Sequence, residues 1–373
     1  MTQSSAVSGA IRNERQQRLA AAMQAEGIDV LVVAGNAWRS DYLRFAADIT
    51  PIEGNALAFV ERDGTARVLI DSAVEAARLA AEYPHLSVSA SARLFDDAEA
   101  LILRLGKRNA ALAPNAAMPY RLALGPLGPT LNSGTALLDR VMLKKSPAEI
   151  DAVRRAAALA DDGYAIFRAA SRVGRREYEL VADVEAYFRS RGCPENFQIL
   201  GSGGVEVRGM HPPGERRLAQ GDLVTTELTP CVEGYYAQIC RTLVVGEPSE
   251  RQRRAYAVFR EALEAGVAAV RPGATAGDVA RAENEVFRGH GLGDYVTSEY
   301  TRVRGHGVGL YVDGAHILED VTLTLEPGMT LIVHPNTYHP DVGYIVLGDT
   351  VVVTDSGCDV LCRTSRELFH EPV

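Results

Sequence analysis

The sequence has few of the features that mark secreted, membrane or nucleic-acid-binding proteins. Its five cysteines are an odd number without zinc-type pairing, which argues against a disulfide framework. It has no apolar run of about eighteen residues and no basic, apolar leader before Arg12, so neither a membrane span nor a signal peptide is expected. A formal net charge of −9 without a basic stripe counts against nucleic acid and anionic membranes. These absences predict a cytoplasmic location.

The length of 373 residues predicts two domains. In the first part, the apolar pattern alternates between helices and strands, as in a small α/β domain. The expected helices are 11–27, 73–83 and 95–106, and the expected strands are 28–34, 56–60 and 67–70. Ser146 to Glu149 then form a capping box with proline at the first helical position, which begins a new helix. We therefore expect an N-terminal domain over 1–143 and a second domain over 144–373.

The second domain contains an internal repeat with a constant offset of 99 positions. The matched pairs are Gly174 and Gly273, Phe188 and Phe287, Arg189 and Arg288, and Gly192 and Gly291. Each copy reads as a helix pair followed by a strand hairpin, at 223–228 with 235–245 and at 330–333 with 343–353. Aligning Gly221 with Gly328 makes Glu227 the counterpart of His334. Two such halves predict an α+β domain with a pseudo-twofold axis and a site between the halves.

Three stretches of this domain resemble the metal-site segments of the creatinase, prolidase and aminopeptidase P family. They are GDLVTTELTPCVEGYYAQICRT (221–242), RGHGVGL (304–310), and LEPGMTLIVHPNTY followed by VLGDTVVVT (325–338 and 346–354). The resemblance covers roughly residues 11–360, and the motifs are specific in combination. It implies the pita-bread fold for the second domain and a creatinase-type N-terminal domain before it.

The resemblance also shows where this chain departs from the peptidases. Those enzymes bind two metal ions through two aspartates, one histidine and two glutamates. The corresponding positions here are Glu227, Gln238, His306 and His334, and the position of the second glutamate falls near Gly348. Two divalent ions bring +4, whereas Glu227 alone supplies −1, so about three charges would stay uncompensated in a partly buried pocket. A neutral amide and a glycine also cannot bridge two ions. The sequence therefore predicts that the two-metal centre has been lost.

Creatinase resembles the peptidases in fold but works without a metal, and its catalytic histidine precedes the Gly-Asp turn. His211 lies in the similar place here. The leading hypothesis is thus a metal-free hydrolase that cleaves a C–N bond, other than an ordinary peptide bond, in a small amide, amidine or guanidino compound. His211 would transfer the proton, and Glu227 would stabilise the resulting imidazolium or hold the water. His306 and His334 would polarise the substrate. The candidates for substrate contacts are Arg208, Tyr236, Gln238, Arg304, Asp313, Trp38 and Arg39.

Two alternatives use the same fold. Glu227, His306 and His334 form a set of two histidines and one carboxylate, which suits one ion of iron, manganese or zinc. The chain would then be a mononuclear metal-dependent enzyme. Alternatively, the site is inactive and the chain is a binding protein, because fold alone does not establish activity.

The resemblance further implies a homodimer in which the N-terminal domain of one subunit covers the cleft of the other. The loop over 36–54 is the candidate for this contact, because aromatic residues and arginine are enriched at interface hot spots. Trp38 and Arg39 are the residues expected to reach the neighbouring site.

Overall fold

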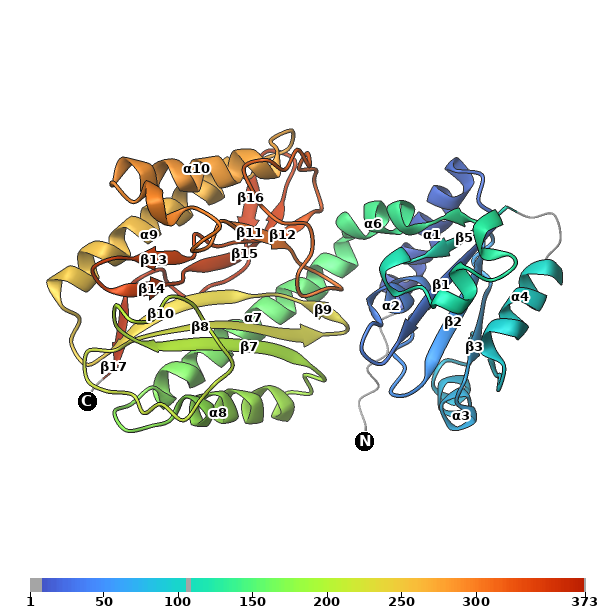
Figure 1. The fold of residues 1–373 in the computed structure, drawn as a ribbon, viewed down its shortest axis with the longest axis horizontal. Helices are drawn as coiled ribbons and strands as arrows, with labels where there is room; N and C mark the ends of the chain where they lie inside the picture. Colours follow the sequence, from blue (N-terminus) through green and yellow to red (C-terminus); the bar gives the residue numbers. More distant parts are fainter. Residues whose placement is uncertain (1–8, 105–108, 372–373) are drawn as a thin grey trace. The chain divides into compact units, whose positions relative to one another are not determined.

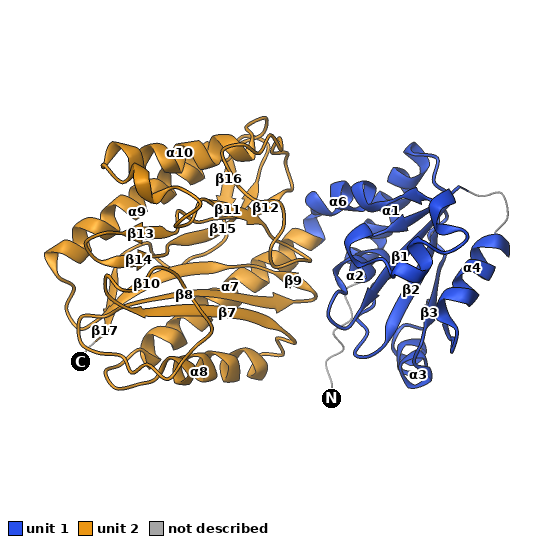
Figure 2. Ribbon diagram, viewed as in Figure 1, with its two compact units in different colours: residues 1–148 blue, residues 149–373 orange. Residues whose placement is uncertain are grey.

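The computed structural model describes residues 9–104 and 109–371. Its internal contacts divide the chain into two compact units, Met1–Ala148 and Glu149–Val373 (Figure 2). The division falls in the first turn of helix α7 (Pro147–Ala170), the helix for which the sequence predicts a proline start. None of the described helices is long and apolar enough to cross a lipid bilayer.

The first unit is a mixed six-stranded sheet with helices packed around it (Figure 1). Its strands, in the order β4-β3-β2-β1-β5-β6, are β1 (Val30–Asn36), β2 (Asn55–Glu61), β3 (Ala66–Ile70), β4 (Ser87–Ala90), β5 (Ala110–Ala113) and β6 (Asn132–Ser133). Its helices are α1 (Gly9–Ala25), α2 (Asp41–Ala47), α3 (Ala73–Glu82), α4 (Leu94–Arg104), α5 (Tyr120–Ala123) and α6 (Thr135–Leu143), with short 3-10 turns at Asn115–Ala117 and Gly128–Thr130. The α/β domain is confirmed, although residues 105 and 106 of the third expected helix lie outside the described residues.

The second unit is a nine-stranded sheet with four long helices. The helices are α7, α8 (Glu177–Ser190), α9 (Glu250–Ala269) and α10 (Ala276–Gly289), with a 3-10 turn at Gly293–Tyr295. The main strand order is β11-β12-β15-β10-β8-β7, for β7 (Asn196–Gly203), β8 (Leu223–Val232), β10 (Ile239–Val245), β11 (Gly305–Gly307), β12 (Thr330–Val333) and β15 (Gly348–Val353). Three short strands pair with inner strands of this order: β9 (Tyr235–Tyr236) with β8, β16 (Cys358–Val360) with β15, and β17 (Phe369–Glu371) with β10. Strands β13 (Thr337–His339) and β14 (Gly343–Ile345) form a separate hairpin.

The predicted repeat is present in both the elements and the backbone. Helix α8 spans 177–190 and α10 spans 276–289, which is the same offset of 99 positions. The glycines that end corresponding helices have matching left-handed backbone angles: φ is 80° at Gly192 and 74° at Gly291. The glycines before the hairpins match as well, with φ of 87° at Gly221 and 89° at Gly328. Glycine populates this region without a Cβ penalty, so the same turn is built twice.

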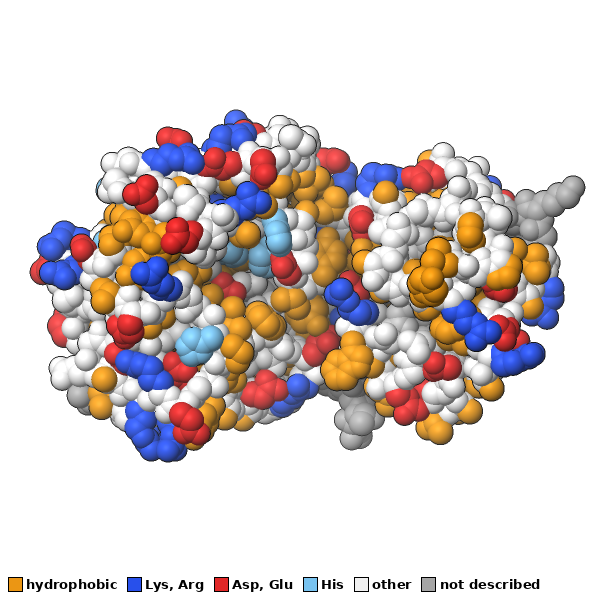
Figure 3. Space-filling model, viewed as in Figure 1, with side chains coloured by type: hydrophobic (Ala, Val, Ile, Leu, Met, Phe, Trp, Pro, Cys, Tyr) orange, Lys and Arg blue, Asp and Glu red, His pale blue; other side chains and the backbone are white. Residues whose placement is uncertain are grey.

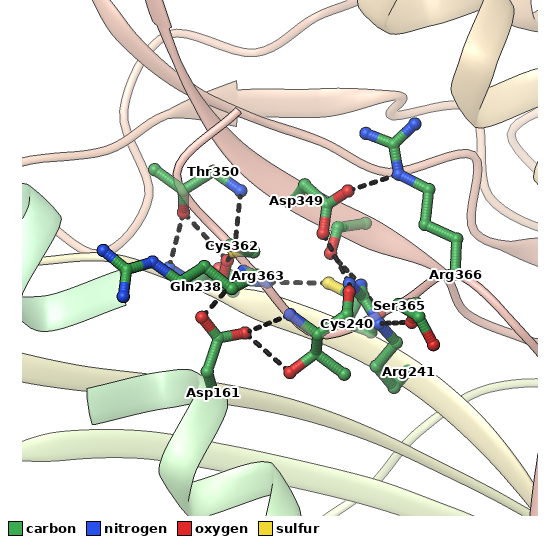
Figure 4. Close-up of polar contacts among 12 residues, drawn as sticks. Asp161, Gln238, Cys240, Arg241, Asp349, Thr350, Cys362, Arg363, Ser365 and Arg366 are labelled. Carbon is green, nitrogen blue, oxygen red and sulfur yellow. Dashed lines mark hydrogen bonds and ion pairs between the residues drawn. The ribbon is translucent and has the colours of Figure 1, made fainter. Parts of the chain in front are cut away.

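A buried ion network joins the two halves of the sheet to the C-terminal segment (Figure 4). Arg241 of β10 is fully buried and donates to the carboxylate of Asp349 of β15 at 2.7 Å, and the second oxygen of Asp349 accepts from Arg366 at 2.7 Å. Arg241 also donates to the carbonyl of Thr364 at 2.8 Å. Asp161 of α7 accepts the backbone N–H of Thr364 at 2.9 Å. The network therefore fixes residues 363–366 against both β-strands and α7.

Removing Asp349 should destabilise the protein strongly, because Arg241 would keep a buried charge without a partner. Breaking one side of such a pair costs about 3–5 kcal/mol. We expect Asp349→Ala to lower the urea midpoint of unfolding accordingly. The matched control is Asp359→Ala, whose partner Arg154 lies at 3.2 Å with both side chains about half exposed, and which should cost under about 1 kcal/mol. Equal losses in the two variants would show that the buried network does not stabilise the fold as proposed.

Candidate active site

Strand alternation turns Glu227 away from the helices of the first half. In β8, Val224 and Leu228 belong to the core cluster that packs against α7 and α8. Because neighbouring side chains on a strand point to opposite faces, Glu227 lies on the other face of the sheet. Cys240 of β10 is its direct cross-strand partner. The open face of the first half therefore carries a carboxylate next to a thiol.

The second half of the unit places His306 and His334 on one face of the sheet. His306 of β11 lies opposite Ile332 of β12, and His334 follows two positions after Ile332, so the three share one face. Ile332 packs in one apolar cluster with Cys240, which connects the two halves. In the space-filling view, histidine side chains gather at a hollow in the face of the second unit (Figure 3). Glu227 and the two histidines are thus brought to the same region.

The carboxylate of Glu227 is buried and held by an amide. The side chain of Asn336 donates from Nδ2 to Oε1 of Glu227 at 2.8 Å. Burial raises the pKa of Glu227 to about 7, and hydrogen bonds from Cys240, Asn336 and Gln238 oppose this rise. A negative charge on Glu227 therefore depends on the polar groups around it.

His306 has one ring nitrogen engaged with the backbone. Its Nδ1 lies 3.0 Å from the carbonyl oxygen of Gly307, and Asp313 approaches the same nitrogen at 3.7 Å. Burial lowers the pKa of His306, so the neutral ring is favoured near pH 7. When Nδ1 carries the proton and donates to the carbonyl, Nε2 keeps its lone pair free. Metal-binding histidines commonly use this arrangement.

His334 is the second buried imidazole of the site. Its ring centre lies 5.4 Å from that of His306, with the ring planes at 66°. Burial, followed by the proximity of His306, holds the pKa of His334 well below its ordinary value. Its Nδ1 is buried, and no described residue offers that atom a hydrogen bond. An orphaned buried nitrogen of this kind calls for a ligand or a bound water.

Gly348 and His334 are sterically linked. A Cβ built on Gly348 would lie 2.5 Å from Cβ of His334 and 2.8 Å from the carbonyl oxygen of Val333. The side chain of His334 thus occupies the space next to the position where the peptidases carry a glutamate. Gln238 is buried as well, and its Nε2 lies 3.4 Å from Sγ of Cys240. Neither position supplies an anionic ligand.

Arg304 lies behind the site and does not face a substrate. It is fully buried, and its guanidinium donates to Oδ1 of Asn284 at 2.5 Å and to the carbonyl of Asn336 at 2.9 Å. Its own carbonyl accepts the backbone N–H of His334 at 3.1 Å. Arg304 therefore fixes both His334 and the amide that holds Glu227. Tyr236, another expected substrate contact, is likewise packed into the core beside α7 and α8.

His211 is not paired with Glu227. Its side chain is half exposed, its Nδ1 lies 2.7 Å from the carbonyl of Pro212, and among the described carboxylates only Glu177 comes within 4 Å, at 3.9 Å. Asp313 is also exposed and accepts from His316 at 3.1 Å. The structure thus joins Asp313 to His306 but separates His211 from its expected partner.

The other expected substrate contacts are exposed. Arg208 lies in the segment between β7 and β8, and Trp38 and Arg39 lie in the turn after β1. The sequence-based reasoning missed Asn336, which stands two positions after His334, just past the end of a buried strand. It also missed the neighbour His316.

Comparison with known proteins decides the family. Residues 151–355, which are more than half of the chain, match the model of metallopeptidase family M24. The chain belongs to this family. It covers the fold of the M24 relatives almost completely: dipeptidase PepE from Mycobacterium ulcerans superposes with a TM-score of 0.81 and 28% identity over 98% of this chain and 99% of that chain. The pita-bread fold is therefore confirmed.

The curated M24 relatives carry peptidase names. The Xaa-Pro dipeptidase of Pyrococcus furiosus is 33% identical over 60% of this chain and 64% of its own length. The probable dipeptidase PepE of Mycobacterium tuberculosis is 32% identical over 69% of this chain and 67% of its own length. The first two curated relatives are matched over less than two thirds of their own lengths, 64% and 65%.

These findings correct two expectations. The hypothesis of a creatinase-like enzyme for non-peptide C–N bonds is wrong, because the relatives are named as dipeptidases. The expectation of no metal cofactor is also wrong, since the matched family is one of metallopeptidases. The departures at individual ligand positions drew the interpretation toward creatinase. The neutral state of His306 and His334 nevertheless fits metal binding as well as it fits metal-free polarisation, because neutral imidazole is the ligand form.

A two-ion centre does not fit the side chains of this M24 member. Gln238 is neutral and Gly348 has no side chain, so neither position supplies a bridging carboxylate. One ion fits the donors better, because the site holds two neutral imidazoles, one of which has the orphaned Nδ1 of His334, and one carboxylate. In the described ranges, no three His, Cys, Asp or Glu side chains already form a metal-binding group. The pair of histidines is therefore the starting point for a site.

We expect Gly348→Ala to destabilise the protein by about 1–3 kcal/mol, because the added methyl group overpacks the backbone and Cβ of His334. Thermal unfolding measures this change. Gly357→Ala is the matched control, since a Cβ there meets nothing within 4 Å, and it should change stability by less than about 0.5 kcal/mol. A Gly348→Ala variant as stable as the control would mean that His334 does not hold the position described.

Proposed function

We propose that this M24 member is a metal-dependent hydrolase that cleaves the amide bond of a small peptide or peptide-like substrate with one divalent ion. The observation that carries the proposal is the buried pair of neutral imidazoles of His306 and His334, at positions that the motif resemblance aligns with metal ligands of the peptidases. Glu227 would complete a set of two histidines and one carboxylate, which suits iron, manganese or zinc. The names of the relatives support the substrate class.

The ion, when bound, would polarise the scissile carbonyl as a Lewis acid. The protein's own residues would prepare the site for it. Asn336 donates a hydrogen bond to Oε1 of Glu227, and the other neighbours of Glu227 orient its second carboxylate oxygen. The Nδ1 contact of His306 with Gly307 orients its Nε2 lone pair. The exposed carboxylate of Asp313 lies beside His306 and would bind a positively charged group of the substrate.

Metal analysis tests the proposal directly. Protein purified without a chelating column should contain about one metal ion per chain, and His306→Ala should lose it together with hydrolysis of Xaa-Pro dipeptides. His290→Ala is the control, because His290 is an exposed histidine paired with Glu261 at 3.0 Å, outside the site. Two ions per chain, or full turnover in strong chelator, would contradict the one-ion site. Bound metal without turnover of any peptide would favour the alternative of a non-catalytic binding protein.

We also propose that the protein is a homodimer in which Trp38 and Arg39 reach the neighbouring site. Trp38 is the only tryptophan and is 91% exposed, so it does not contribute to the core of its own unit. The side chain of Asn36 accepts the backbone N–H groups of Trp38 and Arg39 at 2.9 and 3.1 Å, which fixes the turn that presents them. An ordered turn with an exposed tryptophan and an arginine has the composition of an interface hot spot.

Replacing both Trp38 and Arg39 by alanine should shift sedimentation toward monomer and raise KM, because anchor residues of this kind each cost about 2 kcal/mol or more when truncated. Tyr120→Ala is the control for loss of an exposed aromatic side chain, since Tyr120 is 79% exposed in the same unit. An active wild-type monomer at the assay concentration would rule out the composite site.

The cysteines support a cytoplasmic location for this proposed enzyme. All five are free, and Cys193, Cys231, Cys240 and Cys362 are buried. Reduced thiols are typical of proteins from the cytosol.

A further inference from the structure

Glu283 of α10 is a buried carboxylate that the proposed mechanism does not use. Its side chain is fully buried, and in the described part of the chain neither of its carboxylate oxygens accepts a hydrogen bond. Burial raises the pKa of Glu283 well above its usual range, and the charge of Arg304 opposes this rise. An acid buried at such a cost calls for a specific reason.

The internal repeat indicates that the fold alone does not require an acid at this place. With the offset of 99 positions, Glu283 corresponds to Val184 of α8. By the same offset, Gly266 of α9 corresponds to Phe167 of α7. Val184 and Phe167 are fully buried in the apolar core of the first half. The second half thus carries a carboxylate and a glycine where the first half carries two apolar side chains.

Gly266 makes room for this carboxylate. A Cβ built on Gly266 would lie 2.4 Å from Oε1 of Glu283 and 2.7 Å from its Cγ, so any larger residue would displace the acid. Glycine is unfavourable inside a helix, and at this position the close approach of Glu283 accounts for it. The packing of α9 against α10 is therefore adapted to a charged side chain.

Arg304 is the buried cation whose charge Glu283 offsets, and residues of α10 surround it. Its Nε donates to Oδ1 of Asn284 at 2.5 Å, and its guanidinium carbon lies 5.5 Å from the ring centre of Phe287. Its Nη2 is buried and donates to none of the described residues. Burial lowers the pKa of Arg304, and Glu283 is the charge that most strongly opposes this. Glu283 therefore supplies the counter-charge of a guanidinium that is held inside the protein.

Arg304 in turn connects α10 to the candidate active site. Its guanidinium donates to the carbonyl of Asn336 at 2.9 Å, and its own carbonyl accepts the backbone N–H of His334 at 3.1 Å. Asn336 donates to the carboxylate of Glu227 at 2.8 Å. The interactions thus run from Glu283 through Arg304 to both sides of the site.

We propose that Glu283 is a positioning residue of the candidate active site. Its buried carboxylate holds the guanidinium of Arg304, and Arg304 holds His334 and Asn336 in the arrangement that binds the ion. This inference rests on the proposed one-ion hydrolase. Glu283 acts through Arg304 and is not itself a ligand.

Calorimetric titration of the metal-free protein with zinc alone tests the proposal. Glu283→Gln keeps the volume of the side chain and removes its charge. It should bind zinc about 10-fold more weakly than the wild type, at the lower end of the range for residues that orient metal ligands. Glu285→Gln is the matched control and should bind zinc as the wild type does, because Glu285 is an exposed acid of the same helix, paired with Arg288 at 2.6 Å. Unchanged affinity in a folded Glu283→Gln protein would overturn the proposal.

Gly266→Ala moves the same carboxylate without changing any charge. The added Cβ would push Oε1 of Glu283 aside, so the affinity for zinc should again fall by about 10-fold. Gly289→Ala is the control, since a Cβ there meets nothing within 4 Å, and its affinity should equal that of the wild type. If Glu283→Gln does not fold, Gly266→Ala decides: wild-type affinity in this variant would contradict the positioning role.

A double-mutant cycle with Arg304→Gln separates positioning from general destabilisation. If Glu283 acts through Arg304, Glu283→Gln should weaken zinc binding in the wild type and should not weaken it further in Arg304→Gln. An equal loss in both backgrounds would indicate that Glu283 only stabilises the fold, and the proposal would then be wrong.

Nuclear magnetic resonance of the metal-free protein keeps the test independent of the proposed function. If the wild type binds no divalent ion, the one-ion hydrolase fails, but the ring resonances of His334 still report on Glu283. A change of these resonances in Glu283→Gln that is absent in Glu285→Gln would support the positioning role. Identical His334 resonances in both variants and the wild type would overturn it.

Discussion

The site depends on how one buried carboxylate is kept satisfied. Glu227 lies on a buried part of the sheet, where an unpaired charge is costly. The side-chain amide of Asn336 donates a hydrogen bond to its carboxylate at 2.8 Å. Asn336 is itself fixed, because Arg304 donates to its carbonyl and its own side-chain oxygen accepts the backbone N–H of Leu347 at 3.1 Å. Since the carbonyl of Arg304 also accepts from His334, one buried arginine positions both sides of the site. The geometry of the site is therefore set by Arg304 and Asn336, which are buried beneath it.

The fold was predictable because its signals are local and repeated. Capping residues and strand alternation each depend on a few neighbours in the sequence. The constant offset of 99 positions is visible without coordinates, and the matched φ angles of Gly192 and Gly291 show that the backbone follows it. Aligning the two hairpins through Gly221 and Gly328 also makes Glu227 the counterpart of His334 in the sequence alone. A residue's face on a strand follows from its register, so this part of the site was open to prediction.

The roles of individual polar residues were less predictable, because they depend on contacts between distant segments. Arg304 and Arg208 are both close in sequence to motif residues, yet one is fully buried behind His334 and the other lies exposed over two tyrosine rings. The partner of Glu227 is Asn336, 109 positions away, whereas the expected partner His211 lies beside Glu177. No local pattern distinguishes these cases. The metal-free interpretation failed for a different reason: it inferred the absence of any metal from the loss of the two-metal centre.

Read together, the changed positions form one coherent rearrangement. In a two-ion site, bridging anions balance the cations; here the bridging positions hold the neutral Gln238 and the space-making Gly348, while Asn336 donates to the remaining anion. A Cβ at 348 would lie 2.5 Å from Cβ of His334 and 2.8 Å from the carbonyl oxygen of Val333, so the backbone at this point leaves no room for a side chain at 348. Relative to a two-ion site, these changes reduce the negative charge of the site and add hydrogen-bond donors to it. A site with less anionic charge balances fewer cations, and this charge balance, more than any single ligand, is the physical basis for proposing one ion here instead of two.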